Sequence, residues 1–307
     1  MTTVLPQIPS GDLDTHFHGK NILIIGGTAG LGRALTIELL KHGAQVTVVG
    51  RREPDQALAS AKFVKKDLTL MKTAVELADE IDVTTLDALI FTVGIIAAST
   101  RQENGEGIEL DLAVSYLSRL AFARRIVDKG FGSRRENQAQ KPRIFVMGFP
   151  GENTTPTIDD FNSEKAYSVM PTHLNTVVGN EAMVAYLNKE FKGAVNVYGL
   201  NPGLIKTEIR DNYLGKGSLT STIVETLIGF FNISPAGYAQ HHLIHVIASP
   251  QLEDKPGAHI DQRRKLLPGN PYLAVEENQN RVMTESLKLI DKALGASSSA
   301  SASEERR

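Results

Sequence analysis

The stretch NILIIGGTAGLGRALTIELLKHG, residues 21–43, constrains the fold more than any other part of the chain. Its first half is a short apolar run typical of a buried strand, and its second half has helical spacing and ends at Gly43. Gly26, Gly30 and Gly32 lie in the run GGTAGLG between the two halves. A strand, a tight glycine turn and a helix in this order turn free backbone N–H groups toward an anion such as a dinucleotide pyrophosphate. A purely structural turn is the alternative.

Strand-like and helix-like segments alternate over the rest of the chain. The strand-like runs are AQVTVVG, AKFVKKDL, LDALIFTVG, PRIFVMG, AVNVYGLNPG and a short GAHID. This alternation predicts a parallel sheet with helices on both faces, and no linker interrupts it. We therefore expect a single doubly wound, Rossmann-type α/β domain over residues 21–294. An N-terminal extension at 1–20 precedes it, and a disordered Ser/Ala-rich tail at 295–307 follows it.

Composition excludes several classes of function. The chain has 307 residues, a net charge of −2 and no cysteine. The absence of cysteine excludes disulfides, thiolate metal sites and cysteine nucleophiles, and it fits a reducing compartment, so we expect a cytoplasmic protein. Scattered Lys and Arg give no electrostatic footprint for nucleic acid. No apolar run reaches the ~18 residues that cross a bilayer, so no membrane contact is expected.

Histidines offer a weak metal motif in the C-terminal third. His241, His242 and His245 form an HHxxH spacing on a predicted helix. This spacing lacks the Glu on which the zinc-protease motif depends. We therefore predict no metal site and interpret these residues as one face of a helix.

Two arginines follow the second predicted strand, in the run VVGRR. An acidic side chain at this place would accept a hydrogen bond from the 2′-hydroxyl of a ribose, whereas a guanidinium fits a 2′-phosphate. Arg51 and Arg52 therefore favour NADP(H) over NAD as the cofactor. A solvated pair of charges on a loop is the alternative interpretation.

With these motifs, the chain resembles the short-chain dehydrogenase/reductase family over roughly residues 18 to 265. Beyond the glycine turn, the resemblance rests on the order and spacing of KKDLT, FTVG and NPGLIKTEI, and IDDFNSEKAYS is similar to the retinol-dehydrogenase-like branch. By this resemblance, the residues that bind the cofactor are Gly26, Thr28, Gly30, Leu31, Gly32, Arg51, Arg52, Asp67, Leu68, Thr92, Val93, Gly94, Pro202, Gly203, Ile205 and Thr207.

The family's catalytic group is, by resemblance, Asn, Ser, Tyr and Lys, and the chain departs from all four. Tyr handles the proton of the substrate oxygen, and it needs the cation of Lys because a free phenol titrates near ~10. Ser115 takes the place of Asn, and Gly148 and Phe149 take the place of Ser. None of the seven tyrosines has a lysine four residues later. Tyr116, Tyr167 and Tyr213 could reach the pocket from flanking segments, although packed or surface tyrosines are the alternative.

The expected helix at 172–191 leaves the register of the Tyr and Lys positions open. A count back from the Pro-Gly pair puts Thr172 or His173 at the Tyr position, whereas the helix end puts Val177 there. The candidate catalytic residues are therefore His173, Thr176, Ser115 and Glu181. His173 could replace Tyr as proton donor because imidazole titrates close to neutral pH, and an ordinary histidine at a helix N-terminus is the alternative. Glu181 has the wrong sign to activate a phenol.

The segment at about 208–235 corresponds to a helical substrate lid in the family. Its apolar side chains, with Phe149, predict a hydrophobic small-molecule substrate. Members often associate through the two long helices, here 106–129 and 173–192, so a homodimer or homotetramer is expected. The sequence therefore predicts an NADP(H)-dependent oxidoreductase acting on a hydrophobic carbonyl or hydroxyl compound with non-standard catalytic residues. A non-redox cyclase, isomerase or dehydratase of natural-product metabolism, or a non-catalytic nucleotide-binding protein, remains the alternative.

Overall fold

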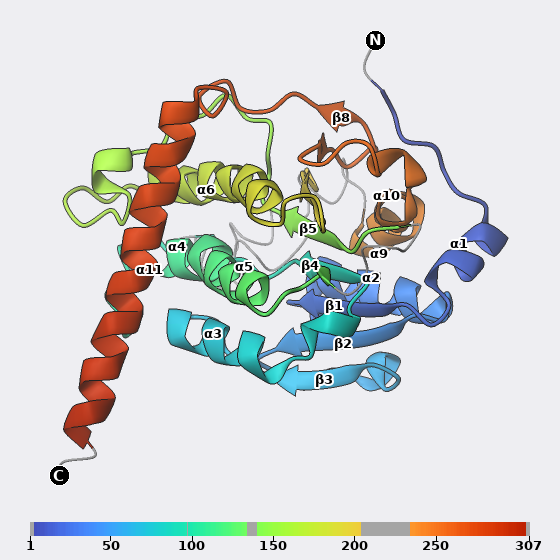
Figure 1. The fold of residues 1–307 in the computed structure, drawn as a ribbon, viewed down its shortest axis with the longest axis horizontal. Helices are drawn as coiled ribbons and strands as arrows, with labels where there is room; N and C mark the ends of the chain where they lie inside the picture. The colour runs from blue at the N-terminus through green and yellow to red at the C-terminus, as the bar shows by residue number, and fades with distance from the viewer. Residues whose placement is uncertain (1–2, 97, 134–139, 204–233, 305–307) are drawn as a thin grey trace.

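The structure is a computed structural model that describes residues 3–96, 98–133, 140–203 and 234–304. Within these residues, eight strands form one sheet in the order β3-β2-β1-β4-β5-β6-β7-β8 (Figure 1). Neighbouring strands pair in parallel, except that β8 is antiparallel to β7. The strands are β1 (Asn21–Ile25), β2 (Gln45–Gly50), β3 (Lys62–Lys65), β4 (Ala88–Phe91), β5 (Arg143–Met147), β6 (Asn196–Leu200), β7 (His259–Ile260) and β8 (Leu266–Leu267).

Helices cover both faces of the sheet, and each layer of helices has its own hydrophobic cluster against it (Figure 1). One layer consists of α3 (Met71–Glu80), α4 (Leu110–Leu112), η3 (Ala113–Leu117), α5 (Ser118–Asp128) and α6 (Val169–Glu190). The other consists of α1 (Ser10–Phe17), α2 (Gly30–Lys41), α9 (Pro235–Tyr238), η7 (Ala239–Leu243) and α10 (Ile244–Ala248). Short 3-10 turns are η1 (Gln56–Leu58), η2 (Val83–Thr85), η5 (Ile158–Asp160) and η8 (Pro250–Leu252). Because both faces are covered, the central strands are almost continuously apolar. The doubly wound α/β prediction is confirmed.

The prediction of one long helix at 106–129 is wrong in detail. Helical structure begins at Leu110, and the stretch Ala113–Leu117 is a π-helical turn. Glu109 ends the preceding loop because its side chain accepts a hydrogen bond from the N–H of Leu112 at 2.8 Å and so caps the helix. The expected lid at about 208–235 falls almost entirely outside the described residues.

Both ends of the chain pack onto this domain or extend from it. In the N-terminal extension, the N–H of Leu5 donates to the carbonyl of Arg264 at 2.9 Å, and Leu13 and Phe17 on α1 are buried. At the other end, α11 (Glu276–Glu304) continues into the tail for which composition predicts disorder. A run of Ala and Ser attached to a formed helix needs no new nucleus, so propagation of the helix is the physical reason for the difference.

Helix α11 crosses over the layer that contains α3 and α6 (Figure 1). The hydroxyl of Tyr116, a fully buried side chain, donates to Ser286 Oγ on α11 at 2.8 Å, and Arg124 on α5 pairs with Asp291 at 3.2 Å. Val282 and Ile290 are buried in the same contact. The helices on which the family resemblance places a dimer interface therefore already carry a helix of the same chain.

Gly179 on α6 lies against the ring of Tyr116. A Cβ at this position would lie 2.5 Å from Tyr116 Cε1, which real side chains do not tolerate. We expect Gly179→Ala to lower the free energy of unfolding by about 1–3 kcal/mol, because overpacking outweighs the roughly 1 kcal/mol of helix propensity that Ala gains. The control is Gly11→Ala on α1, where nothing lies within 4 Å and we expect a small gain. Urea unfolding measures both variants, and a more stable Gly179→Ala protein would contradict the packing argument.

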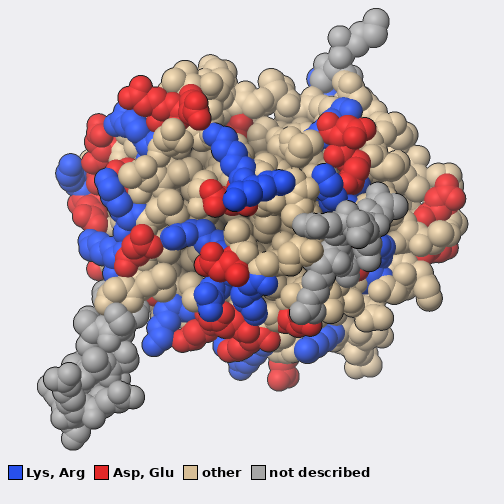
Figure 2. Space-filling model, in the orientation of Figure 1, with Lys and Arg blue, Asp and Glu red and all other residues tan. Residues whose placement is uncertain are grey.

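The surface carries both signs of charge. On the face shown in Figure 2, Lys and Arg are interspersed with Asp and Glu. Among the residues that the structure describes, no helix is long and apolar enough to cross a membrane.

Candidate active site

The glycine turn joins β1 to α2 at the place where the strand order reverses. Gly26 and Gly30 have φ values of 96° and 52°, which favour glycine. A Cβ on Gly26 would lie 2.5 Å from the backbone N of Val93, and one on Gly32 would collide with the carbonyl of Gly26. Two of the glycines therefore let α2 and the end of β4 close on the turn, while Gly30 is exposed on its surface.

The first turn of α2 is suited to receive an anion. Its N-cap residue, Ala29, makes no side-chain cap, and the first turn holds no acidic residue. Thr28 packs against Gly50 at the end of β2, and Leu31 is buried beneath the turn. The backbone N–H groups and the positive end of the helix dipole therefore face the open side of the turn. These residues fit the pyrophosphate of a dinucleotide.

The residues predicted to bind the adenine end of the cofactor lie on the loops after β2 and β3. Arg51 and Arg52 directly follow β2 and are exposed, whereas Arg33 on α2 is held by Asp55 at 2.7 Å. After β3, the exposed Asp67 accepts a hydrogen bond from the N–H of Thr69 at 3.2 Å. Leu68 beside it is buried. The guanidinium groups of the two arginines are thus exposed to solvent at the end of β2.

The residues predicted to bind the nicotinamide side of the cofactor lie at the ends of β4 and β6. The N–H groups of Thr92 and Val93 donate to the carbonyl of Ile25, at 2.9 and 3.0 Å, which joins this segment to the glycine turn; Gly94 follows, half-buried. Gly203, at φ 65°, donates its N–H to Asn201 Oδ1 at 3.0 Å, with Pro202 between them. Ile205 and Thr207 lie outside the described residues.

A chain of polar contacts leads from this segment to the start of α6. Ser115 Oγ accepts a hydrogen bond from the N–H of Ile95 at 2.9 Å and donates to Asp111 Oδ1 at 2.6 Å. The other oxygen of Asp111 contacts His173 Nδ1 at 2.7 Å. The Asp111 side chain has no exposed surface, whereas that of His173 is 21% exposed. His173 and Ser115 are thus brought together through an aspartate for which sequence reasoning had no role.

Arg119 ties the neighbouring strand ends to α6. Its Nη1 donates to the carbonyl of Met147 at 2.7 Å and to Asn180 Oδ1 at 2.9 Å, and its Nη2 donates to the carbonyl of Val93. Burial lowers the pKa of Arg119 to about 9, and the negative charge of Asp111 opposes that shift. A cation therefore lies beneath the site on α5, although α6 lacks the lysine of the family.

Asp111, Ser115 and Arg119 follow one another at intervals of four residues. Residues four apart share a helix face, so this spacing was the signal that could have found Asp111 and Arg119.

The other two catalytic candidates lie apart from this polar chain. Thr176 Oγ1 donates to the carbonyl of His173 at 2.7 Å and is buried, so its hydroxyl is used within its own helix. Glu181 points elsewhere and accepts from the N–H groups of Gly151 and Asn270 and from His259. Burial opposes its ionisation, yet these donors together hold the pKa of Glu181 below its ordinary value. Glu181 therefore connects a loop and the C-terminal segment to α6.

Gly148 and Phe149, which the resemblance aligns with the family's Ser, lie at the end of β5. A Cβ on Gly148 would lie 2.5 Å from Asn180 Cβ, so glycine admits the Asn180 side chain. Phe149 has a φ of 59°, in the left-handed region that bulky residues avoid. Phe149 is therefore a half-buried aromatic residue with a strained backbone at the end of β5.

The described tyrosine candidates are engaged elsewhere. Tyr116 bonds Ser286, and burial raises the pKa of its phenol. Tyr167 donates to the carbonyl of Ala98 at 2.5 Å, and its pKa is also raised by burial. Tyr213 lies outside the described residues.

No group of three or more His, Asp or Glu within the described ranges could hold a metal ion. His245 accepts a hydrogen bond from the N–H of Ile8, and His242 stacks on Tyr238.

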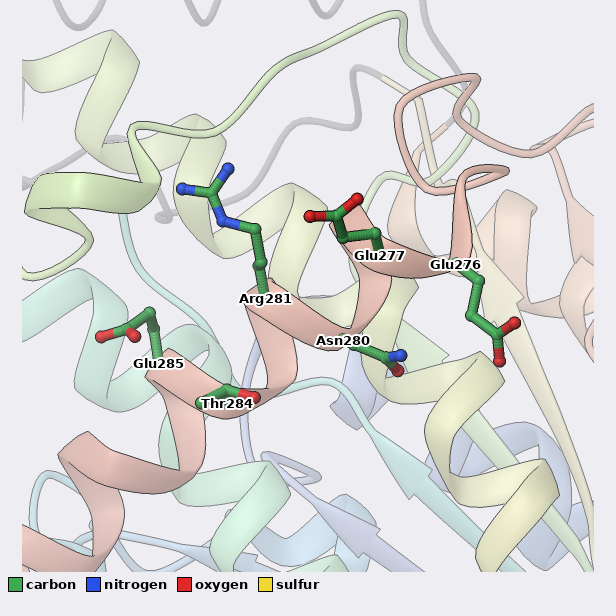
Figure 3. Close-up of a pocket in the computed structure, with 6 residues that line it drawn as sticks. All are labelled: Glu276, Glu277, Asn280, Arg281, Thr284 and Glu285. Carbon is green, nitrogen blue, oxygen red and sulfur yellow. The ribbon is translucent and has the colours of Figure 1, made fainter.

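A shallow hollow of about 440 Å³ lies on α11 (Figure 3). Its side chains spread along a single helix and do not converge on one point. None of its lining residues belongs to the glycine turn or to the polar chain around Asp111. The lining residues are Glu276, Glu277, Asn280, Arg281, Thr284 and Glu285.

Glu109 provides a pH-dependent test of the electrostatics around Asp111. Burial, followed by the negative charge of Asp111, raises the pKa of Glu109 to about 7. A carboxyl with a raised folded-state pKa destabilises the fold when ionised, so this cost grows as pH rises from about 4.5 to 7. We expect the change in the free energy of unfolding caused by Glu109→Gln to be more stabilising at pH 8 than at pH 5, by roughly 2 kcal/mol. Urea unfolding at both pH values measures this difference, with exposed Glu190→Gln as the control; equal effects of Glu109→Gln at both pH values would contradict it.

Comparisons with known proteins bear on the family and the fold of the chain. A family model described as short chain dehydrogenase matches residues 20–127. The chain is 40% identical to an uncharacterized oxidoreductase from Saccharomyces cerevisiae over 92% of this chain and 91% of the relative. It is 22% identical to retinol dehydrogenase 13 from Homo sapiens, over 89% of this chain and 85% of the relative.

A solved structure shares the fold. The short chain dehydrogenase from Shigella flexneri complexed with NADP superposes with a TM-score of 0.57 at 14% identity, over 80% of this chain and 98% of that one. The parallel sheet, the glycine turn and the extent of the yeast match lead to one assignment. The chain belongs to the short-chain dehydrogenase/reductase family of oxidoreductases, in its retinol-dehydrogenase-like branch.

Proposed function

We propose that the protein is an NADP(H)-dependent oxidoreductase that interconverts a hydrophobic carbonyl compound and its alcohol, with His173 in the role of the family's tyrosine. The observation that carries this proposal is the contact of 2.7 Å between His173 Nδ1 and the buried Asp111, on the nicotinamide side of a glycine turn suited to a dinucleotide. Nicotinamide, when bound, supplies the hydride. The chain itself must bind the cofactor, place the substrate and handle one proton.

The cofactor choice rests on the residues after β2. Arg51 and Arg52 are exposed there, and the sequence carries no acidic residue directly after the strand to accept from a ribose 2′-hydroxyl. Guanidinium groups bind phosphate oxygens through charge-assisted hydrogen bonds, which supports NADP(H). The NADP complex of the Shigella flexneri relative is in agreement with this choice.

The substrate class rests on two residues of the predicted site, Phe149 and His173, and on the name of a relative. Phe149 replaces the hydroxyl of the family's serine, and the relative from Homo sapiens is by name a retinol dehydrogenase, which implies a long apolar alcohol. An aromatic side chain and a partly buried imidazole favour an apolar molecule with one polar oxygen. We therefore expect hydrophobic aldehydes, ketones or alcohols to be substrates, and sugars not to be.

The test uses the purified full chain with NADPH or NADP⁺ and a panel of apolar aldehydes, ketones and alcohols that includes retinal and retinol. Absorbance at 340 nm follows the nicotinamide, and short sugars serve as the polar control. We expect substrate-dependent change of absorbance with apolar compounds. Product that forms without a change at 340 nm would indicate the non-redox alternative. Binding of NADPH without turnover of any compound would indicate a nucleotide-binding protein.

A further inference from the structure

Asp111 is the buried centre of the polar chain between Ile95 and His173. Its side chain has no exposed surface, and both of its oxygens have polar partners: Ser115 Oγ at 2.6 Å and His173 Nδ1 at 2.7 Å. The carboxylate of Asp111 thus contacts the Nδ1 atom of His173, and Nε2 is the nitrogen of the imidazole that does not take part in this contact.

The direction of each hydrogen bond follows from the atoms. The N–H of Ile95 can only donate, so Ser115 Oγ accepts at this contact. The single hydroxyl proton of Ser115 has two acceptors, the carbonyl of Ile95 at 3.1 Å and Asp111 Oδ1 at 2.6 Å, and the shorter contact is to the carboxylate. The second oxygen of Asp111 is an acceptor too, so His173 must carry a proton on Nδ1.

Of the charged groups near Asp111, Arg119 attracts the carboxylate and Glu109 repels it. Arg119, buried two turns later on the same helix face, supplies an attractive positive charge to Asp111. The side chain of Glu109 is engaged by the N–H of Leu112, and Tyr167 donates its hydroxyl to the carbonyl of Ala98. His173 therefore connects the buried carboxylate of Asp111 to the partly exposed side of the site.

We infer that Asp111 is a positioning residue, which with Ser115 holds His173 in the tautomer that carries a proton on Nδ1 and turns Nε2 toward the substrate. A neutral imidazole fixed in this way offers a lone pair on Nε2, and its protonated form offers an N–H there. The role of this arrangement in catalysis rests on the proposed oxidoreductase function. In the direction of reduction, protonated His173 would give its Nε2 proton to the carbonyl oxygen and return to the neutral form with a proton on Nδ1, while Asp111 would remain a carboxylate; a bound nicotinamide would supply the hydride.

The decisive experiment observes the imidazole directly and needs no substrate. The full chain is labelled with ¹⁵N-histidine, and the His173 signals are assigned by their loss in His173→Gln. We expect neutral His173 in the wild-type protein to be protonated on Nδ1, the less common form of free imidazole. In Asp111→Asn the signals should shift toward the Nε2-protonated form. The control, Asp291→Asn on α11, removes an exposed carboxylate and should leave the His173 signals unchanged.

The possible results separate clearly. A wild-type His173 protonated on Nε2 overturns the inference without any variant, even if Asp111→Asn fails to fold. An unchanged tautomer in a folded Asp111→Asn protein overturns it as well. Ser115→Ala removes one donor to the carboxylate, so we expect a partial shift; no shift in this variant would remove Ser115 from the arrangement.

A second measurement separates this inference from the proposed function. Once a substrate is known, Asp111→Asn should lower kcat by about 10²–10⁴-fold, with KM and the Kd for NADPH changed by less than about threefold, because the carboxylate acts through His173. If the protein turns over no carbonyl or alcohol at all, the proposed function fails while the tautomer result stands. If turnover occurs but the tautomer is wrong, only the role of Asp111 fails.

Discussion

Replacement of His173 by glutamine should lower kcat for any carbonyl or alcohol substrate by about 10²–10⁴-fold, the range that a positioned proton donor contributes. Glutamine can still donate to Asp111 but does not titrate near neutral pH, so the variant removes the proton transfer and keeps the contact that orients the side chain. The Kd for NADPH should change by less than about twofold, because no contact of the glycine turn involves His173. Steady-state kinetics and a calorimetric titration of NADPH measure the two quantities.

The chain offers a matched control for this experiment. His42 also contacts an aspartate through Nδ1, at 2.6 Å from Asp14 Oδ1, but this pair lies at the C-terminal end of α2. His42→Gln should leave kcat within about twofold of the wild-type value. Equal kcat values for His173→Gln and the wild-type protein would show that another group handles the proton.

Arg51→Asp should reverse the preference for NADPH over NADH. A charge-assisted hydrogen bond contributes about 1.5–3 kcal/mol, so loss of the guanidinium should weaken NADPH binding by roughly 10–100-fold. Repulsion between the new carboxylate and the 2′-phosphate adds to that loss, whereas the carboxylate can accept from the 2′-hydroxyl of NADH. The chain has no tryptophan, so the fluorescence of the reduced cofactors or calorimetry is the practical measurement.

Two further variants help to interpret the cofactor preference measured for Arg51→Asp. Arg52→Asp shows whether the second arginine shares the phosphate. Lys72→Asp, an exposed change of the same charge on α3, controls for the overall change in electrostatic potential and should alter both affinities alike. Equal affinities for NADPH and NADH in the wild-type protein would contradict the interpretation of the VVGRR run.

The architecture was largely predictable because its signals are local. The apolar run at Asn21–Ile25, the glycines after it and the helical spacing to Gly43 are all neighbours in sequence, and they specify a strand, a turn and a helix without any distant contact. The same holds for β2, β4, β5 and β6. The two-residue strands were harder, and β8 was missed because a pair of leucines has no periodicity to detect.

The site was only partly predictable because its partners come from different elements. The sequence predicts His173 and Ser115 as site residues, but each prediction depends on a single position of the family pattern and includes no contact between the two. Asp111 joins them across 62 residues of sequence, and Arg119 reaches Asn180 across 61. Glu181 was a candidate as well, yet its contacts with Gly151 and His259 direct it away from His173.

By itself, the order of residues determined the parallel sheet, the glycine turn and the departure from the usual Tyr and Lys, because these depend on spacing along the chain. Only the tertiary structure decided that a buried aspartate lies behind His173, that Glu181 lies apart from that pair, and that α11 covers Tyr116. The physical reason is that burial and hydrogen-bond partners are set where distant segments meet, and no spacing along one segment records which side chains will meet there.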